Sequence, residues 1–212
     1  MGLLRSKLDP CMFIKKHNGQ WNGKTELLVA AFVDDLAVSG THETIKWFAN
    51  EMQKRFNVKR LGRLKKHLGV WYEWKRDVDN DVCIVATMDS IIQEANDKFH
   101  EIVRRDAELF KTPAYPNTTL SKHHGDAVML TDYRSLVGKC MYYTTKIGPE
   151  CVNAARELAQ HMSNPGQEHW KALERLIGYL RSQKGNGLIY RRPREMRVIA
   201  YADANYATNV DD

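Results

Sequence analysis

The sequence feature that most constrains the fold is the stretch Glu26–Gly40, in which two adjacent aspartates separate two short apolar runs. The runs Glu26–Phe32 and Leu36–Gly40 are too short and too evenly apolar to form amphipathic helices, so they predict two buried strands. Asp34 and Asp35 then lie where the two strands meet. The rest of the chain is expected to support this hairpin in an α+β fold, as an antiparallel sheet with packed helices.

Asp34 and Asp35 are candidate metal ligands. Two like charges about 4 Å apart repel by roughly 4 kcal/mol at an effective dielectric constant of about 20. A nearby cation favours the ionised form of both carboxylates. The pair therefore predicts a divalent metal ion at the strand junction. The alternative is that the two residues form an incidental polar turn.

Composition and charge narrow the class of protein. With 212 residues, 43% of them hydrophobic, the chain is long enough for one large or two small domains. The net charge of +6 favours a polyanionic partner such as nucleic acid. The four cysteines show no C-x-x-C spacing, which argues against a zinc module or a disulfide framework and for a reducing compartment. No apolar run reaches the roughly 18 residues of a membrane span, so we expect a soluble protein without a membrane partner.

A helix and a basic segment are predicted after the hairpin. Thr41 is the expected N-cap of a helix that packs on the hairpin through Ile45, Phe48, Ala49, Met52 and Phe56. The basic segment Lys59–His67 then runs into the aromatic stretch Leu68–Trp74. Cationic residues beside aromatic ones suit a surface that follows a nucleic-acid backbone, and the candidates are Arg60, Arg63, Lys65, Lys66, Leu68, Gly69 and Trp71. The alternative is a solvated charged turn before an ordinary aromatic strand.

The next residues are predicted to complete a first α+β unit that ends at residue 110. Asp77–Asp81 lacks the Gly and the distal Glu of a calcium loop, so it predicts a hairpin turn before a strand at Val82–Ala86. Thr87 is the expected cap of a helix whose apolar face comprises Ile91, Ile92, Ala95, Phe99 and Ile102. Lys111–Leu130 has two prolines and no periodicity, which predicts a linker between domains.

Three helices and two strands are predicted after the linker. The helices cover Thr131–Thr145, Glu150–Met162 and Gln167–Lys184, with Gly and Pro residues at the breaks. The strands cover Leu188–Arg191 and Arg197–Ala204, and the second strand places Asp203 among apolar neighbours. A carboxylate in such a position is either hydrogen-bonded or a metal ligand.

Several of these segments resemble, in order, the polymerase polyprotein of copia-type LTR retrotransposons. Phe32-Val33-Asp34-Asp35 is similar to the Y/F-x-D-D box of reverse transcriptases. Further matches follow at Arg60-Leu61-Gly62, Leu68-Gly69-Val70, Lys111-Thr112-Pro113, Tyr133-Arg134-Ser135-Leu136-Val137-Gly138, Met162-Ser163-Asn164-Pro165, His169-Trp170, Tyr179-Leu180 and Gly187-Leu188-Ile189-Tyr190. Tyr201–Ala207 resembles the opening strand of the attached ribonuclease H domain. The resemblance covers nearly the whole chain.

The resemblance implies a partial reverse transcriptase. Residues 1–110 would be the C-terminal part of the palm, 111–130 a linker, 131–187 the helical thumb and connection, and 188–212 the first strands of a ribonuclease H-like domain. Asp34 and Asp35 would hold Mg²⁺ or Mn²⁺ for two-metal nucleotidyl transfer, and Asp203 would be the first metal ligand of the ribonuclease H site. The segment around Leu68-Gly69-Val70 would lie near the primer terminus. The implied partner is an RNA–DNA or DNA primer-template, in the cytoplasm within a virus-like particle or in the nucleus.

The chain also departs from the family pattern. We expect the fingers, a further palm carboxylate and the nucleotide-binding segment to lie upstream of Met1, and the later ribonuclease H acids to lie beyond Asp212. Asn205 stands at the second acidic position of the D-A-D pattern, and Lys146–Glu150 stands where the family has T-R-P-D. We therefore expect a fragment that is inactive alone and that needs the upstream polymerase part or another protein chain. The alternative is a non-catalytic module, degenerate or co-opted, that binds nucleic acid or a protein.

Overall fold

The computed structural model describes residues 1–16, 25–116, 119–192, 195, 197 and 199–202 of the chain. Its backbone forms two compact units, Met1–His67 and Leu68–Asp212. Within the described ranges the fold is α+β, with two antiparallel sheets and five α-helices, as the sequence predicts. None of these helices is long and apolar enough to cross a membrane.

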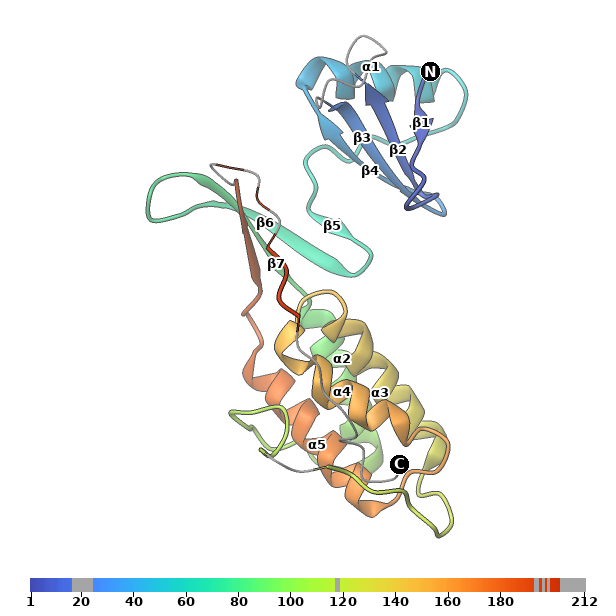
Figure 1. Ribbon diagram of the computed structural model, residues 1–212, viewed down its shortest axis with the longest axis vertical. Coiled ribbons are helices and arrows are strands. Elements are labelled where there is room, and N and C mark those ends of the chain that lie inside the picture. The colour runs from blue at the N-terminus through green and yellow to red at the C-terminus, as the bar shows by residue number, and fades with distance from the viewer. Residues whose placement is uncertain (17–24, 117–118, 193–194, 196, 198, 203–212) are drawn as a thin grey trace. The chain divides into compact units, whose positions relative to one another are not determined.

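The first unit is a four-stranded antiparallel sheet with one helix packed on it (Figure 1). Its strands follow chain order as β1 (Leu4–Arg5), β2 (Met12–Lys16), β3 (Thr25–Phe32) and β4 (Asp35–Gly40), and the helix is α1 (His42–Gln53). Because side chains alternate along a strand, Leu27 and Val29 of β3 point to the same face, where they meet Phe48 of α1. A two-residue strand, β5 (Lys66–His67), ends the unit.

The predicted strands and helix of this unit are confirmed, with two corrections. The strand β4 is not buried, because its side chains are exposed or half-buried along its whole length. The predicted packing face of α1 is smaller than expected: the helix ends at Gln53, so Phe56 lies outside it and is 58% exposed, and Ile45 is also exposed, at 36%.

The start of α1 is held to the sheet by hydroxyl groups. Thr41 Oγ1 accepts a hydrogen bond from the backbone N–H of Thr44 at 3.3 Å, which confirms Thr41 as the N-cap. The hydroxyl of Thr44 in turn donates to the carbonyl oxygen of Glu26 on β3 at 3.0 Å. A Cβ atom at Gly40 would lie 2.5 Å from that same oxygen, so the close approach of β4 to β3 requires glycine there.

The turn between β3 and β4 has a strained residue. Val33 has a φ of 51°, in the left-handed region that β-branched residues rarely adopt. Such a conformation costs about 1–3 kcal/mol. The antiparallel pairing of β3 with β4 on both sides of the turn holds Val33 in this conformation.

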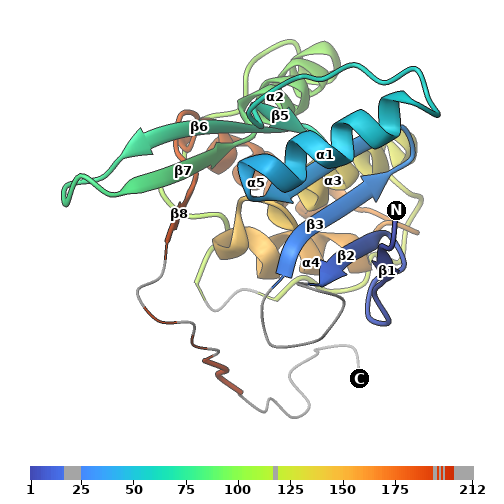
Figure 2. The same cartoon turned by 90° about the horizontal axis from the view of Figure 1, so that it is seen from above.

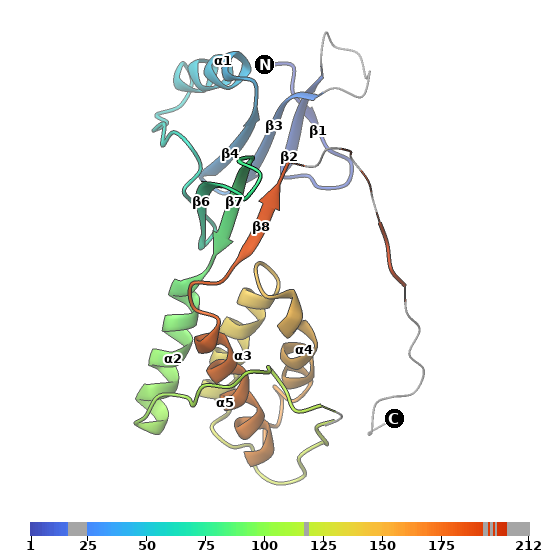
Figure 3. The ribbon, with the colours of Figure 1, turned by 90° about the vertical axis from the view of Figure 1, so that its left-hand side faces the viewer.

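The second unit contains a three-stranded antiparallel arrangement of β6 (Val70–Arg76), β7 (Val82–Thr87) and β8 (Leu188–Arg191), in that order (Figure 3). The predicted turn Asp77–Asp81 is confirmed, since Asp77 Oδ1 accepts hydrogen bonds from the N–H groups of Asp79 and Asp81 at 3.1 and 3.0 Å. The predicted strand at 188–191 is also confirmed. The predicted strand at 197–204 is wrong for residues 197 and 199–202, which are not in a strand, and Asp203 lies outside the described residues.

The helices of the second unit pack together around one core (Figure 2). They are α2 (Asp89–Val103), α3 (Leu130–Thr144), α4 (Val152–Gln160) and α5 (Gln167–Ser182), and the short 3₁₀ helix η2 (Pro149–Cys151) precedes α4. The predicted apolar face of α2 is confirmed, with Ile92, Ala95 and Phe99 buried and Ile91 and Ile102 partly buried against the same core. The other buried helix residues are Tyr133, Leu136, Val137 and Cys140 of α3, and Leu173, Leu176, Ile177 and Leu180 of α5. The predicted N-cap at Thr87 is wrong, because Thr87 ends β7 and the capping residue is Met88 without a side-chain hydrogen bond.

The helix α2 shares its core with α3 and α5, whereas the sequence grouped it with the strands before it. The predicted division into palm, linker, thumb and ribonuclease H segments follows the family resemblance. It therefore stays a prediction.

The predicted linker 111–130 has no helix and no strand before Leu130 in its described part, 111–116 and 119–130. It is nevertheless held to the helices. Trp170 Nε1 donates to the carbonyl oxygen of Val128 at 2.9 Å, and Glu157 Oε1 accepts from the N–H of Leu120 at 2.8 Å. Leu120 and Val128 also pack on the core, so this segment is part of the second unit rather than a free connection.

Two histidines are stacked inside the second unit. The ring centroids of His161 and His169 lie 3.9 Å apart, and the side chains are 6% and 2% exposed. His169 Nδ1 accepts from the N–H of Gly166 at 2.8 Å, so Nε2 carries the proton and donates to the carbonyl oxygen of Ser121 at 3.0 Å. Burial, and next the neighbouring His161, lower the pKa of His169.

We predict that acid destabilises the second unit through His169. Its folded-state pKa is lowered, so the unfolded chain binds the proton first and stability falls as the pH drops below about 6.5. The urea concentration at the midpoint of unfolding should be lower at about pH 5.5 than at about pH 7.5. The difference between the two pH values should be smaller in the variant His169→Gln. A His169 ring that titrates at or above about 6.5 by NMR would contradict the prediction.

We also predict that relieving the strain at Val33 stabilises the β3–β4 hairpin. Asparagine tolerates the left-handed region, so Val33→Asn should slow hydrogen exchange of the β3 and β4 amides by roughly tenfold, or about 1.4 kcal/mol. The control is Val78→Asn, at a 98% exposed residue of the β6–β7 turn that does not have a positive φ. Unchanged exchange in Val33→Asn, or an equal effect on these amides in the control, would show that Val33 is not strained.

Candidate functional site

The two candidate carboxylates lie at the tip of the β3–β4 hairpin. Phe32 pairs with Asp35, so Val33 and Asp34 form a two-residue turn and Asp35 is the first residue of β4. Both aspartates are exposed, as are Phe32 at 54% and Val33 at 86%. The predicted junction of two strands is therefore confirmed, and it presents two adjacent carboxylates to solvent.

The exposure of Asp34 and Asp35 changes the electrostatic argument drawn from the sequence. In water, two charges about 4 Å apart repel by only about 1 kcal/mol, so the exposed pair does not require a cation to offset the repulsion. Within the described ranges, neither aspartate forms an ion pair, and no group of three or more His, Cys, Asp or Glu residues is placed to hold a metal ion. The repulsion between the two residues is thus no evidence for a bound metal.

The donor set of the hairpin fits Mg²⁺. This ion keeps several waters and is commonly held by one or two carboxylates together with the phosphates of a substrate. Asp34 and Asp35 supply two carboxylates at an exposed position where water and phosphate groups have access. They are the residues that would hold the ion.

The basic candidates for nucleic-acid binding fall in the first unit. Arg60 donates hydrogen bonds to Asn50 Oδ1 and, at 2.9 Å, to Gln53 Oε1, so it ties the chain after α1 back to that helix. Arg63, Lys65 and Lys66 are exposed. The side chains of this group lie at the surface of the unit, as binding to a phosphate backbone requires.

The remaining nucleic-acid candidates begin the second unit. Leu68 and Gly69 have φ values of 47° and 76°, which make a tight turn before β6. The hydroxyl of Tyr142 on α3 donates to the carbonyl oxygen of Leu68 at 2.7 Å and holds this turn in place. Trp71 is 47% exposed on β6. A structural role in the turn thus accounts for Leu68 and Gly69, and Trp71 has a surface available for contact.

The third candidate carboxylate, Asp203, lies outside the described residues, as does Asn205. Of the three candidate carboxylates, the structure describes Asp34 and Asp35, which lie together at one hairpin turn. The sequence did not predict that Arg60 would form hydrogen bonds to α1. No signal in a basic run distinguishes an arginine that contacts its own helix from one that contacts a phosphate.

No protein-family model and no solved structure matches the chain. One relative is matched over a shorter stretch: a protein named secreted RxLR effector protein 161 from Plasmopara viticola is 35% identical over 79 residues, which are 37% of this chain and 56% of that protein.

Other relatives match along the whole chain. The retrovirus-related Pol polyproteins from transposons RE1 and RE2 of Arabidopsis thaliana are 27% and 26% identical over 214 aligned residues and cover 100% of this chain. The corresponding polyprotein from transposon TNT 1-94 of Nicotiana tabacum is 24% identical over 99% of it. The chain spans 14–16% of the length of these three relatives. The resemblance predicted from the sequence is confirmed: over its whole length this chain is related to the Pol polyproteins of copia-type retrotransposons.

Proposed function

We propose that this chain is a segment of an RNA-directed DNA polymerase, the reverse transcriptase of a copia-type retrotransposon. The observation that carries the proposal is the pair Asp34 and Asp35 at the exposed tip of a β-hairpin, in a chain related from end to end to Pol polyproteins. A tight turn between paired strands holds adjacent carboxylates in one place, which suits ligands of a catalytic metal ion.

In this proposal each part of the chain has a role in the polymerase. Asp34 and Asp35 are the palm carboxylates that hold Mg²⁺ or Mn²⁺. When bound, such ions stabilise the attacking and leaving oxygens of the transferred phosphoryl group. Arg60, Arg63, Lys65 and Lys66, with Leu68, Gly69 and Trp71, contact the backbone of an RNA–DNA or DNA primer-template. The helices α3 to α5 belong to the thumb and connection, and Asp203 belongs to the ribonuclease H site.

The activity is proposed for the longer polyprotein rather than for residues 1–212 alone. The chain spans a small share of its polyprotein relatives, and the described residues place two carboxylates at the hairpin. Further ligands and the nucleotide-binding segment would come from upstream sequence or another chain. The site of action would be intracellular, in a cytoplasmic virus-like particle or in the nucleus.

We predict that Asp34→Asn in a full-length polyprotein lowers primer extension on an RNA template by at least about 100-fold, because one metal-binding charge is lost. Primer-template binding should change by less than about twofold, since Asp34 has no positive charge with which to neutralise a phosphate. The measurement is extension with Mg²⁺ beside a binding titration.

The matched control is Asp79→Asn, in the exposed turn between β6 and β7, which should leave extension unchanged. Loss of binding in Asp34→Asn would make the pair structural. Nucleotide incorporation by residues 1–212 alone would refute the need for additional ligands.

A second candidate function is a non-catalytic module that binds nucleic acid or a protein. One observation favours it: the relative that matches this chain over 79 residues is named as a secreted effector protein and not as a polyprotein. If the chain binds RNA–DNA duplex, its affinity should fall steeply with salt as Lys and Arg release counterions. No binding at low salt would direct the search to a protein partner.

A further inference from the structure

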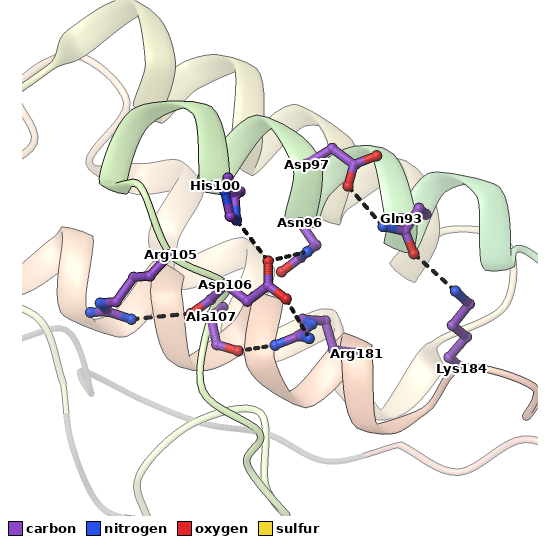
Figure 4. Close-up of polar contacts among 9 residues, drawn as sticks. All are labelled: Gln93, Asn96, Asp97, His100, Arg105, Asp106, Ala107, Arg181 and Lys184. Carbon is purple, nitrogen blue, oxygen red and sulfur yellow. Dashed lines mark hydrogen bonds and ion pairs between the residues drawn. The ribbon is translucent and has the colours of Figure 1, made fainter.

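The residues that follow α2 in the second unit run along α5. Asp106 accepts a hydrogen bond from Arg181 of α5 at 3.0 Å, and Arg181 also donates to the carbonyl oxygen of Ala107 (Figure 4). About one turn earlier on α5, a Cβ atom at Gly178 would lie 1.7 Å from the carbonyl oxygen of Glu108. The close approach therefore requires glycine there, and the start of the segment is held against the helix.

The next contact between the segment and α5 is made by Arg175. Its Nη2 atom donates to Thr112 Oγ1 at 2.7 Å. Its Cζ atom also lies 4.6 Å from the ring centroid of Phe110 and 3.8 Å from that of Tyr115. Cation–π contacts with two rings restrict the position of the guanidinium group. The group is thus held beside the hydroxyl of Thr112.

The contacts of Arg175 do not include a carboxylate. In the part of the chain that the structure describes, Arg175 forms one hydrogen bond and no ion pair, although a guanidinium group has five N–H donors. The carboxylates of Glu174 and Glu108 interact with Arg105 instead. Glu157, which lines a small hollow with Arg175, accepts from a backbone N–H group. Arg175 therefore has donors available for an anion that forms at its hydroxyl partner.

Thr112 has the sequence context and the exposure of a phosphorylation site. It is the one Ser or Thr of the 212-residue chain that is followed directly by proline. Its side chain is exposed, and residues 111–116 are in neither a helix nor a strand. Pro113 disfavours the helical conformation at Thr112 and favours the extended one, in which peptides enter the active sites of kinases. Because Oγ1 accepts the bond from Arg175, that bond does not engage the hydroxyl proton.

We propose that Thr112 is phosphorylated by a proline-directed protein kinase and that Arg175 binds the resulting phosphate. In the reaction a bond forms between Oγ1 and the γ-phosphorus of ATP, and the bond from that phosphorus to the β-phosphate oxygen breaks. ADP leaves, and the hydroxyl proton passes to the catalytic base of the kinase.

The modification changes the contact between Thr112 and Arg175 in kind. A phosphate brings nearly two negative charges and three strong acceptor oxygens, so a hydrogen bond to a neutral hydroxyl becomes a charge-assisted pair. Lys111, exposed beside Thr112, adds a second positive charge. The phosphate therefore fastens the segment to α5. The site does not use Asp34 or Asp35, so it stands apart from the proposed polymerase function.

The first test is to incubate the whole chain with a purified cyclin-dependent kinase and Mg-ATP and to locate the phosphate by mass spectrometry. We expect the phosphate on Thr112 and its loss in Thr112→Ala. The matched control is Thr119→Ala, which removes another exposed threonine after the same helix and should be labelled as the parent chain is. No phosphate on Thr112, or equal labelling of Thr119, would overturn the proposal.

The second test compares the phosphorylated and unphosphorylated forms of each variant, so that any change in the unmodified fold cancels. Phosphorylation should slow hydrogen exchange of the amides of residues 110–115 about tenfold in the parent chain and leave it unchanged in Arg175→Met. By ³¹P NMR the second pKa of the phosphate should lie below about 6 in the parent and near about 6 in Arg175→Met.

The control for the second test is Arg156→Met, which removes an exposed arginine of α4 that forms no hydrogen bond or ion pair with Thr112. It should behave as the parent chain does in both measurements. Equal slowing of exchange in Arg175→Met and in the parent, or a phosphate pKa that Arg175→Met does not change, would show that Arg175 does not bind the phosphate.

Discussion

The backbone register of the β3–β4 hairpin is the constraint on which the candidate site depends. Pairing of Phe32 with Asp35 fixes the length of the turn, and the same register directs Leu27 and Val29 toward Phe48 of α1. A slip by one residue would turn every side chain of the strand to the opposite face. Burial of the core therefore selects the register that places Asp34 and Asp35 at the exposed tip, and the left-handed Val33 is the local cost of that arrangement.

Elements whose contacts join residues close together in the sequence could be predicted. The hairpin, the cap at Thr41, the turn held by Asp77 and the buried stripe of α5 each depend on residues a few positions apart, so local pattern and turn chemistry were sufficient. The two carboxylates of the candidate site were found for the same reason, since they are adjacent in the chain. Their exposure to solvent was not predicted, because an even run of apolar residues does not show whether other elements pack over that strand.

Features that depend on distant partners could not be predicted. Arg181 meets Asp106, and β8 pairs with β7 across about a hundred residues of chain, as the register of Tyr190 with Ile84 shows. The segment predicted as a linker is held by Trp170, and α2 joins a core built mainly by later helices. Tertiary contacts determine these arrangements, and neither secondary-structure propensity nor the spacing of apolar residues predicts such contacts. The hydrogen bond from α5 to Thr112 belongs to this class as well.

Paramagnetic Mn²⁺ can show whether Asp34 and Asp35 bind a divalent metal ion, as proposed. Titrating the chain with Mn²⁺ while recording amide NMR signals reports which residues lie near the ion. We expect the signals of residues 33–36 to broaden first, and the double variant Asp34→Asn with Asp35→Asn to abolish this selectivity. Broadening that is spread equally over other exposed acidic residues such as Asp79 and Asp81, or unchanged in the double variant, would contradict it.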